Sequence, residues 1–251
     1  MNKTAIKNFA IWARNKLIAD VSYDARLIGI TEDGIAKPLP QSFGGTQFFD
    51  IGTAEPYSIS GEAVRQRDKL IEVIQQKEKD TDYKTAYQYV IEEVAYTWFN
   101  RFIALRFMEV NNYLPSHTRI FSDEDGNFKP EVLTDAVNLE IDGLDKELVL
   151  ELLEQQQNEQ LYQYIIITQC NALNEGLPEM FERIGGWTEL LFPKNLLRED
   201  SVIAHMVKDI PESDWNDQVQ IIGWLYQYYN SEPKDKVFAN LKKNIKISAA
   251  D

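Results

Sequence analysis

One stretch of this chain constrains its possible folds more than any other. Residues 94–111, VAYTWFNRFIALRFMEVN, place five aromatic residues and two arginines in a segment with helical spacing. On a helical wheel of about 100° per residue, one narrow arc contains Glu93, Thr97, Arg101 and Ala104. Apolar residues fill most of the remaining circumference, and such a helix is expected at the centre of a bundle. We therefore predict a long central helix over residues 82–111.

Arg106 falls inside the apolar part of this predicted helix. An unpaired charge that is buried in a protein core is very costly, so a buried arginine needs a carboxylate or backbone carbonyl groups beside it. We therefore expect the arginines of this segment to tie neighbouring elements to the central helix.

The rest of the chain predicts further helices and little β-structure. Apolar spacing favours an amphipathic helix over residues 5–19, and Asp33-Gly34 within residues 26–39 indicates a β-hairpin. The stretch from there to Ser60 is rich in glycine and proline and is expected to be a loop. Further helices are expected at residues 60–79, 146–157, 160–174, 177–184 and 187–193, with Ser60 as the cap of the first. One more helix is expected to end at Lys208 and to be capped by Asp200 or Ser201. The last is expected to begin near Trp215 and to be capped by Ser213.

These elements define the expected fold class as mainly α, an irregular multi-helix bundle with a small β-hairpin near the N-terminus. The 251 residues suffice for one helical domain or for two joined subdomains, which would divide as residues 1–115 and 116–251.

Composition and charge exclude several classes of protein. The chain has 26 basic and 40 acidic residues and a net charge of −14, which argues against a general nucleic-acid binder. No apolar run approaches the roughly 20 residues of a membrane-spanning helix, and the first residues do not resemble a targeting signal. The single cysteine, Cys170, excludes an internal disulfide and suggests a reducing cytoplasm.

Motifs for metals and phosphates are weak. The acidic run at 123–127 resembles a calcium loop, but the twelfth position counted from Asp123 is Thr134 and not glutamate, so a surface turn is favoured. His117 and His205 are far apart in the sequence, which makes a metal site improbable. The glycine pairs at 44–45 and 185–186 match no phosphate-binding motif and are interpreted as turns.

Candidate reactive and stacking groups also favour structural roles. Cys170 lies in an apolar helical stretch and is interpreted as a buried thiol. The adjacent Glu92 and Glu93 point in different directions on a helix and do not form an acid–base pair. Tyr226, Tyr228 and Tyr229 could stack on nucleic-acid bases, but their helical spacing favours packing.

Three segments carry a resemblance to a known family. They are VAYTWFNRFIALRFMEVNNYLPS at 94–116, FERIGGWTELLFPKNLLREDSVI at 181–203 and DWNDQVQIIGWLYQYYNSEPKDKVF at 214–238, and the opening residues 1–31 also fit. The chain resembles the N-terminal region of the PglX family, the large adenine-specific DNA methyltransferases of BREX phage-defence systems. The resemblance covers essentially the whole chain, in order.

The resemblance implies an S-adenosylmethionine-dependent enzyme that methylates N6 of adenine in a recognised DNA site. In such enzymes an Asn-Pro-Pro-Tyr type motif holds a base that has been flipped out of the stack. This sequence contains no Asn-Pro-Pro or Asp-Pro-Pro and no glycine-rich cofactor loop. No catalytic, cofactor-binding or metal-binding residue is therefore predicted, and the chain alone is expected to be inactive because the catalytic domain lies outside it.

Three hypotheses describe what such a region does. The first is a scaffold for the catalytic domain and the DNA cleft, with DNA-contact candidates in the basic tail: Lys234, Lys236, Lys242, Lys243 and Lys246. A solvated helix face is an equally good interpretation of that tail. The second is a module that docks other BREX proteins, and the third is a free-standing acidic interaction protein or DNA mimic. A membrane partner is not expected.

Overall fold

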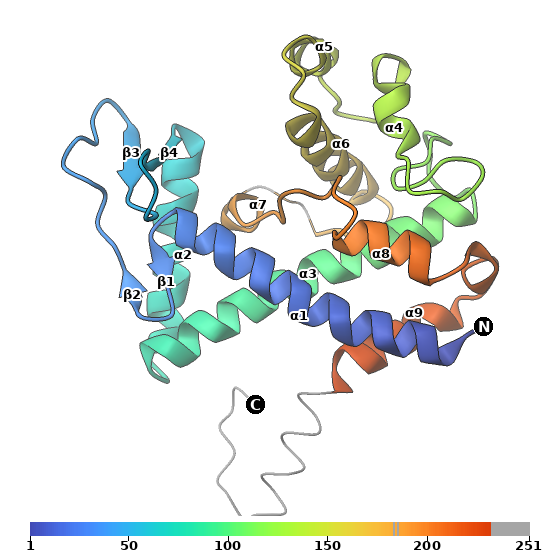
Figure 1. Cartoon of the computed structure of the whole chain (residues 1–251), viewed down its shortest axis with the longest axis horizontal. Helices are drawn as coiled ribbons and strands as arrows, with labels where there is room; N and C mark the ends of the chain where they lie inside the picture. Colours follow the sequence, from blue (N-terminus) through green and yellow to red (C-terminus); the bar gives the residue numbers. More distant parts are fainter. Residues whose placement is uncertain (183, 185, 232–251) are drawn as a thin grey trace, which may run out of the picture.

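The computed structural model describes residues 1–182, 184 and 186–231. Two long helices form its axis, α1 (Lys3–Leu27) and α3 (Tyr83–Val110), which pack on each other (Figure 1). Each begins at a capping side chain, since Asn2 accepts a hydrogen bond from the Ala5 amide at 3.2 Å and Asp82 accepts one from the Thr85 amide at 3.0 Å. Helix α1 is longer than the predicted 5–19, because its buried apolar positions continue to Leu27.

Helix α3 is the central helix that the sequence predicts. Trp98, Phe99 and Phe102 are buried, and the Trp98 ring meets the Phe192 ring edge-on at 4.6 Å between centroids. The helix differs from the predicted wheel in one respect. Arg101 and Ala104 are also buried, so the polar arc of the wheel ends before them, and Arg101 Nη2 donates to the Glu182 carbonyl at 2.8 Å.

Two small hairpins lie between α1 and the next helix of the chain. Strands β1 (Ile30–Thr31) and β2 (Gly34–Ile35) pair antiparallel at the predicted hairpin, which is thereby confirmed. Strands β3 (Thr46–Phe49) and β4 (Tyr57–Ser60) form a second antiparallel hairpin where the sequence predicted a loop. Helix α2 (Glu62–Glu78) follows, and its N-cap is Gly61, so the predicted Ser60 cap is wrong: Ser60 still belongs to β4.

The second half adds shorter helical elements. They are α4 (Glu131–Thr134), η1 (Ala136–Asn138), α5 (Lys146–Glu154), α6 (Asn158–Leu173), α7 (Trp187–Leu190), α8 (Val202–Asp209), η2 (Glu212–Asp214) and α9 (Gln220–Tyr229). Of the two predicted caps of α8, Asp200 and Ser201, the structure has Ser201, which accepts from the Ala204 amide at 3.1 Å. The helix predicted over 177–184 is wrong for the described residues, which form turns. The predicted Ser213 cap is also wrong, because Ser213 lies inside η2 and α9 begins at Gln220.

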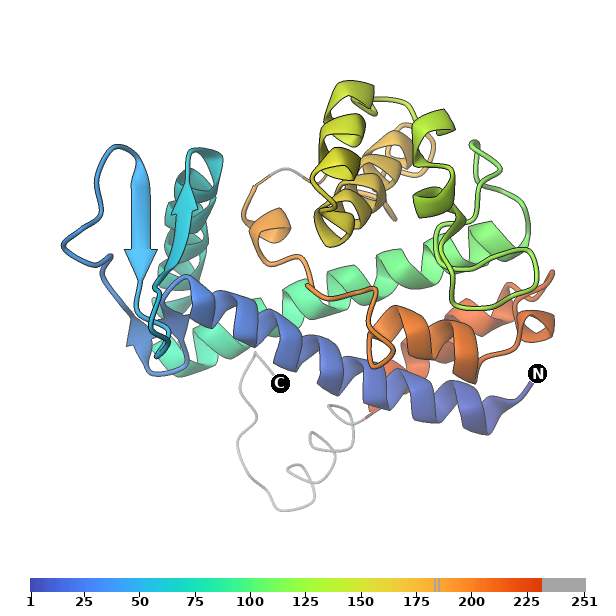
Figure 2. The ribbon, with the colours of Figure 1, turned by 45° about the horizontal axis from the view of Figure 1, so that its top comes forward.

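The elements build a mainly α molecule with two projections on one side of the long helices. Hairpin β3–β4 with α2 forms one projection, and α4, α5 and α6 form the other (Figure 2). A single hydrophobic core joins α1, α3, α6, α8 and α9. Among the described residues, no helix is long and apolar enough to span a membrane.

Candidate functional site

The five predicted DNA-contact lysines, Lys234, Lys236, Lys242, Lys243 and Lys246, lie outside the described residues. The hollows and polar clusters of the described residues are the remaining candidates for a functional site. Two neighbouring hollows share Glu189 of α7: one lies along α6, and the other lies between the two projections.

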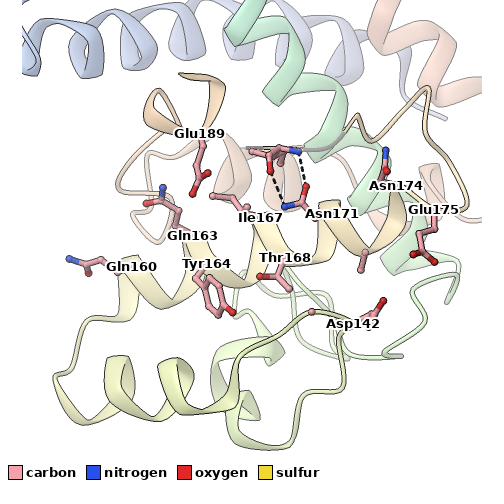
Figure 3. Close-up of a pocket in the computed structure, with 13 residues that line it drawn as sticks. Asp142, Gln160, Gln163, Tyr164, Ile167, Thr168, Asn171, Asn174, Glu175 and Glu189 are labelled. Carbon is pink, nitrogen blue, oxygen red and sulfur yellow. Dashed lines mark hydrogen bonds between the residues drawn. The ribbon is translucent and has the colours of Figure 1, made fainter. Parts of the chain in front are cut away.

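The first hollow, which we call the α6 pocket, lies along one face of α6 (Figure 3). It has a volume of about 500 Å³ and is lined by α6 together with the 142–143 turn, Ile184 and α7. Its polar lining consists of amides, carboxylates and hydroxyls: Asp142, Gln160, Gln163, Tyr164, Thr168, Asn171, Asn174, Glu175 and Glu189. No lysine or arginine is among the described residues that line it, so the pocket is poorly suited to a phosphate group.

Two of these amides are already used to hold the chain that follows α6. The Asn171 side chain donates to the Ile184 carbonyl at 3.1 Å and accepts from the Ile184 amide at 2.7 Å (Figure 3). Asn174 Nδ2 donates to the Phe181 carbonyl at 2.8 Å. These bonds satisfy backbone groups of a non-helical segment. Glu189 is hydrogen-bonded to Gln66, and the remaining polar side chains of the lining include Gln160, Gln163 and Glu175.

The second hollow, which we call the β4 groove, continues from the first. Gln160, Gln163 and Glu189 line both of them. The β4 groove has a volume of about 560 Å³ and lies between strand β4, the start of α2, the start of α6 and residues 189–195. Burial raises the pKa of both carboxylates that line it, Glu159 and Glu189.

Lys194 is the basic residue among the described residues lining the β4 groove, and it is already engaged. Its ammonium donates to the Tyr57 hydroxyl at 2.9 Å and lies 3.5 Å from Asp24 Oδ1. Asp24 is buried in α1, and burial raises the pKa of its carboxyl from 3.8 to about 6. This contact joins α1, β4 and the segment after α7, so it fixes one wall of the groove.

Arg106 lies in a buried polar cluster, as predicted from its position among apolar residues. It is fully buried, forms ion pairs with Glu109 and Glu212, and donates to Ser122 Oγ at 2.9 Å. Glu109 also accepts from the Ile120 and Phe121 amides, each at 2.6 Å. The cluster ties α3 to the 119–122 segment and to η2, and its role is structural.

The remaining candidates from the sequence have structural environments. Cys170 is buried, as predicted, and burial raises the pKa of its thiol to about 12, which disfavours a nucleophilic role. The Tyr229 ring packs 4.3 Å from the Phe99 ring, in agreement with the packing interpretation. His117 contacts Asn112, and the His205 ring lies against the Trp12 ring in a tilted arrangement, with 4.1 Å between centroids. The described residues hold no group of three or more metal-ligating side chains.

The described residues do not fit a methyl donor. Nucleotide-like cofactors in α/β enzymes bind at a glycine-rich turn after a strand of a parallel sheet. The two sheets in the described part of this chain are both two-stranded antiparallel hairpins. Neither hollow has such a turn.

No protein-family model matches the chain. The chain is nevertheless homologous to one region of the adenine-specific methyltransferases, so the predicted resemblance is confirmed. It is 40% identical to the adenine-specific methyltransferase PglX of Lacticaseibacillus casei (strain Zhang) over 96% of its length, and 36% identical to the adenine-specific methyltransferase BrxX of Escherichia coli O9:H4 (strain HS) over all of it. It spans only about a fifth of either relative, 21% and 20%.

Proposed function

We propose that this chain is a non-catalytic helical region of a BREX-type, site-specific DNA N6-adenine methyltransferase, and that it supports the catalytic domain and the DNA cleft. The observation that carries the proposal is the match of nearly the whole chain to a fifth of two adenine-specific methyltransferases. The absence of a catalytic motif from the sequence, and of a cofactor fold from the described residues, supports the non-catalytic part.

The proposal assigns the chemistry to the rest of the polypeptide. S-adenosylmethionine would be bound by the full-length protein outside residues 1–251, and we propose these residues as an N-terminal domain of it. The full-length protein would bind DNA in the cytoplasm, where the single buried thiol of Cys170 stays reduced.

The basic tail offers a test of a direct role in DNA binding. A full-length variant with Lys234, Lys236, Lys242, Lys243 and Lys246 all changed to glutamate should bind duplex DNA more weakly, and its affinity should depend less steeply on salt. Methyl transfer to the same duplex should fall with it.

A matched control keeps the total charge change equal. It carries the same substitution at five exposed lysines of the described region: Lys7, Lys37, Lys69, Lys79 and Lys146. If the control loses as much affinity as the tail variant, or if the tail variant binds and methylates normally, the tail is not a DNA contact.

A second candidate function is the docking of other proteins of the defence system. The acidic, amide-rich lining of the α6 pocket and the β4 groove favours it, because such surfaces suit peptide groups better than phosphates. Retention of a BREX protein by the chain in a pull-down with nuclease-treated components would support docking. Loss of retention after nuclease treatment would contradict it.

A further inference from the structure

Strand β4 has one edge that nothing in its own hairpin covers. The other strand is different: the Leu39 amide donates to the Phe48 carbonyl at 2.8 Å, and the Phe48 amide donates to Ser42 Oγ at 3.0 Å. These bonds show that the backbone groups of Phe48 point away from β4. The edge of β3 is therefore closed by the loop that precedes it.

The register then fixes the direction of the β4 backbone. Phe48 lies opposite Ser58 in the antiparallel pair. Because Phe48 directs both its N–H and its C=O away from β4, the pair is of the kind that exchanges no hydrogen bonds, and Ser58 directs its own groups away from β3. Ser60 has the same direction, since it is two residues further along. Among the described residues, none bonds to the N–H or C=O of Ser58.

This open edge borders the β4 groove. Residues Tyr57–Ser60 all line it, and in Figure 2 strand β4 is on the side of the hairpin that faces α7. Ser58 is exposed, and the strand sequence YSIS contains neither proline nor lysine, the residues that commonly discourage pairing at a sheet edge. The edge is thus competent to accept another strand.

We propose that the β4 groove binds an extended segment from the remaining part of the full-length methyltransferase, added beside β4 as a third strand, with a lysine or arginine directed at Glu159 and Glu189. The inference rests on the proposed function, because it takes the rest of that protein as the source of the strand. Main-chain hydrogen bonds to Ser58 and Ser60 would provide affinity, and the acidic wall would select the side chain.

Charge and length support this occupant. The groove presents two partly buried carboxylates, and its described cation, Lys194, is occupied by Asp24 and Tyr57. Glu159 accepts from the Leu197 amide at 3.2 Å and Glu189 is hydrogen-bonded to Gln66, but a carboxylate has lone pairs for further donors. A basic side chain complements that wall, whereas a DNA phosphate would be repelled. The relatives are about five times longer than this chain, and a segment of the same polypeptide has the advantage of a high effective concentration.

Site-specific crosslinking in the full-length protein tests the inference. A benzoylphenylalanine at Ser60 should crosslink on irradiation to one peptide outside residues 1–251, and mass spectrometry should find lysine or arginine in that peptide. The same probe at Gln41, exposed in the loop that closes the β3 edge, serves as the control and should not yield that adduct. An adduct within residues 1–251, with another protein or with DNA, or no adduct at all, would overturn the inference.

Two substitutions separate strand addition from mere proximity. Ser58→Pro removes an N–H that points into the groove, not one that bonds to β3, and should lower the crosslink yield at position 60 at least tenfold. Ser58→Thr keeps the N–H and should leave the yield unchanged. Equal yields from the two variants would refute strand addition. The crosslink yield does not depend on catalysis, so the two proposals can fail separately. A full-length protein without methyl transfer would refute the proposed function, and the crosslink would still decide this inference.

Discussion

Replacing Arg106 by methionine should destabilise the protein strongly, although the substitution keeps an unbranched apolar stem. Arg106 and Glu109 are both fully buried, and Glu212 lies 3.1 Å from the second guanidinium nitrogen of Arg106. The charges of the cluster are balanced, because two arginines, Arg106 and Arg119, pair with two carboxylates, Glu109 and Glu212. Removing one arginine leaves a buried carboxylate without its full compensation.

The expected cost follows from that imbalance. Removing one partner of a buried ion pair costs about 3–5 kcal/mol. A chain of this size loses about 2–4 °C of melting temperature for each kcal/mol, so Tm should fall by about 6–20 °C. Urea unfolding followed by tryptophan fluorescence measures the free energy directly, because Trp98 and Trp215 are fully buried and report loss of the core.

Two further variants test the reasoning. Arg65→Met breaks an ion pair with Glu62 whose side chains are 73% and 61% exposed, and it should cost no more than about 1 kcal/mol. The double variant Arg106→Met with Glu109→Gln removes both charges and should be more stable than Arg106→Met alone. A cost below about 1 kcal/mol for Arg106→Met, or simple additivity in the double variant, would refute a coupled buried pair.

Three further predictions concern individual contacts. Burial raises the pKa of Asp24 to about 6, so the stability that protonated Asp24 contributes is complete below about pH 4 and is lost as the pH rises through 6. The unfolding free energy should therefore decline by on the order of 3 kcal/mol over this range, and Asp24→Asn should remove the decline. Parallel curves of unfolding free energy against pH for the two proteins would contradict this prediction. Asn171→Ala should cost about 1–3 kcal/mol and speed hydrogen exchange at the Ile184 amide, whereas unchanged exchange would mean that the two bonds do not hold this segment. Trp98→Ala should cost about 3–5 kcal/mol in urea unfolding, and a cost below about 1 kcal/mol would argue against a central position for α3.

Features that depend on local spacing could be predicted from the sequence. The central helix follows from the apolar positions of residues 82–111, and the first hairpin follows from Asp33-Gly34. The buried state of Arg106 follows from its position among apolar neighbours. Its partner Glu212 was not predictable, because it lies 106 residues away and reaches the cluster only through the tertiary fold.

The β4 groove could not be predicted from the sequence either, because the strand that forms its wall was not predicted. Strands β3 and β4 are four residues each and lie in a stretch rich in glycine and proline, so turn signals outweighed their alternation. Gly61, and not Ser60, is the N-cap of α2, and its positive φ of 57° lets the chain turn directly from strand into helix. The residues of β4 that present their backbone groups at its open edge are set by the register, which a sequence does not specify without its partner strand.

The most direct test of the central claim is transfer of a labelled methyl group from S-adenosylmethionine to adenine in unmethylated duplex DNA. Four samples are compared at equal concentration: the full-length protein, the 251-residue chain, the full-length protein without residues 1–251, and the last two mixed. We expect transfer by the full-length protein, none by the chain alone, a strongly reduced rate for the truncated protein, and partial recovery in the mixture. Transfer by the chain alone, or an undiminished rate for the truncated protein, would contradict a non-catalytic supporting region.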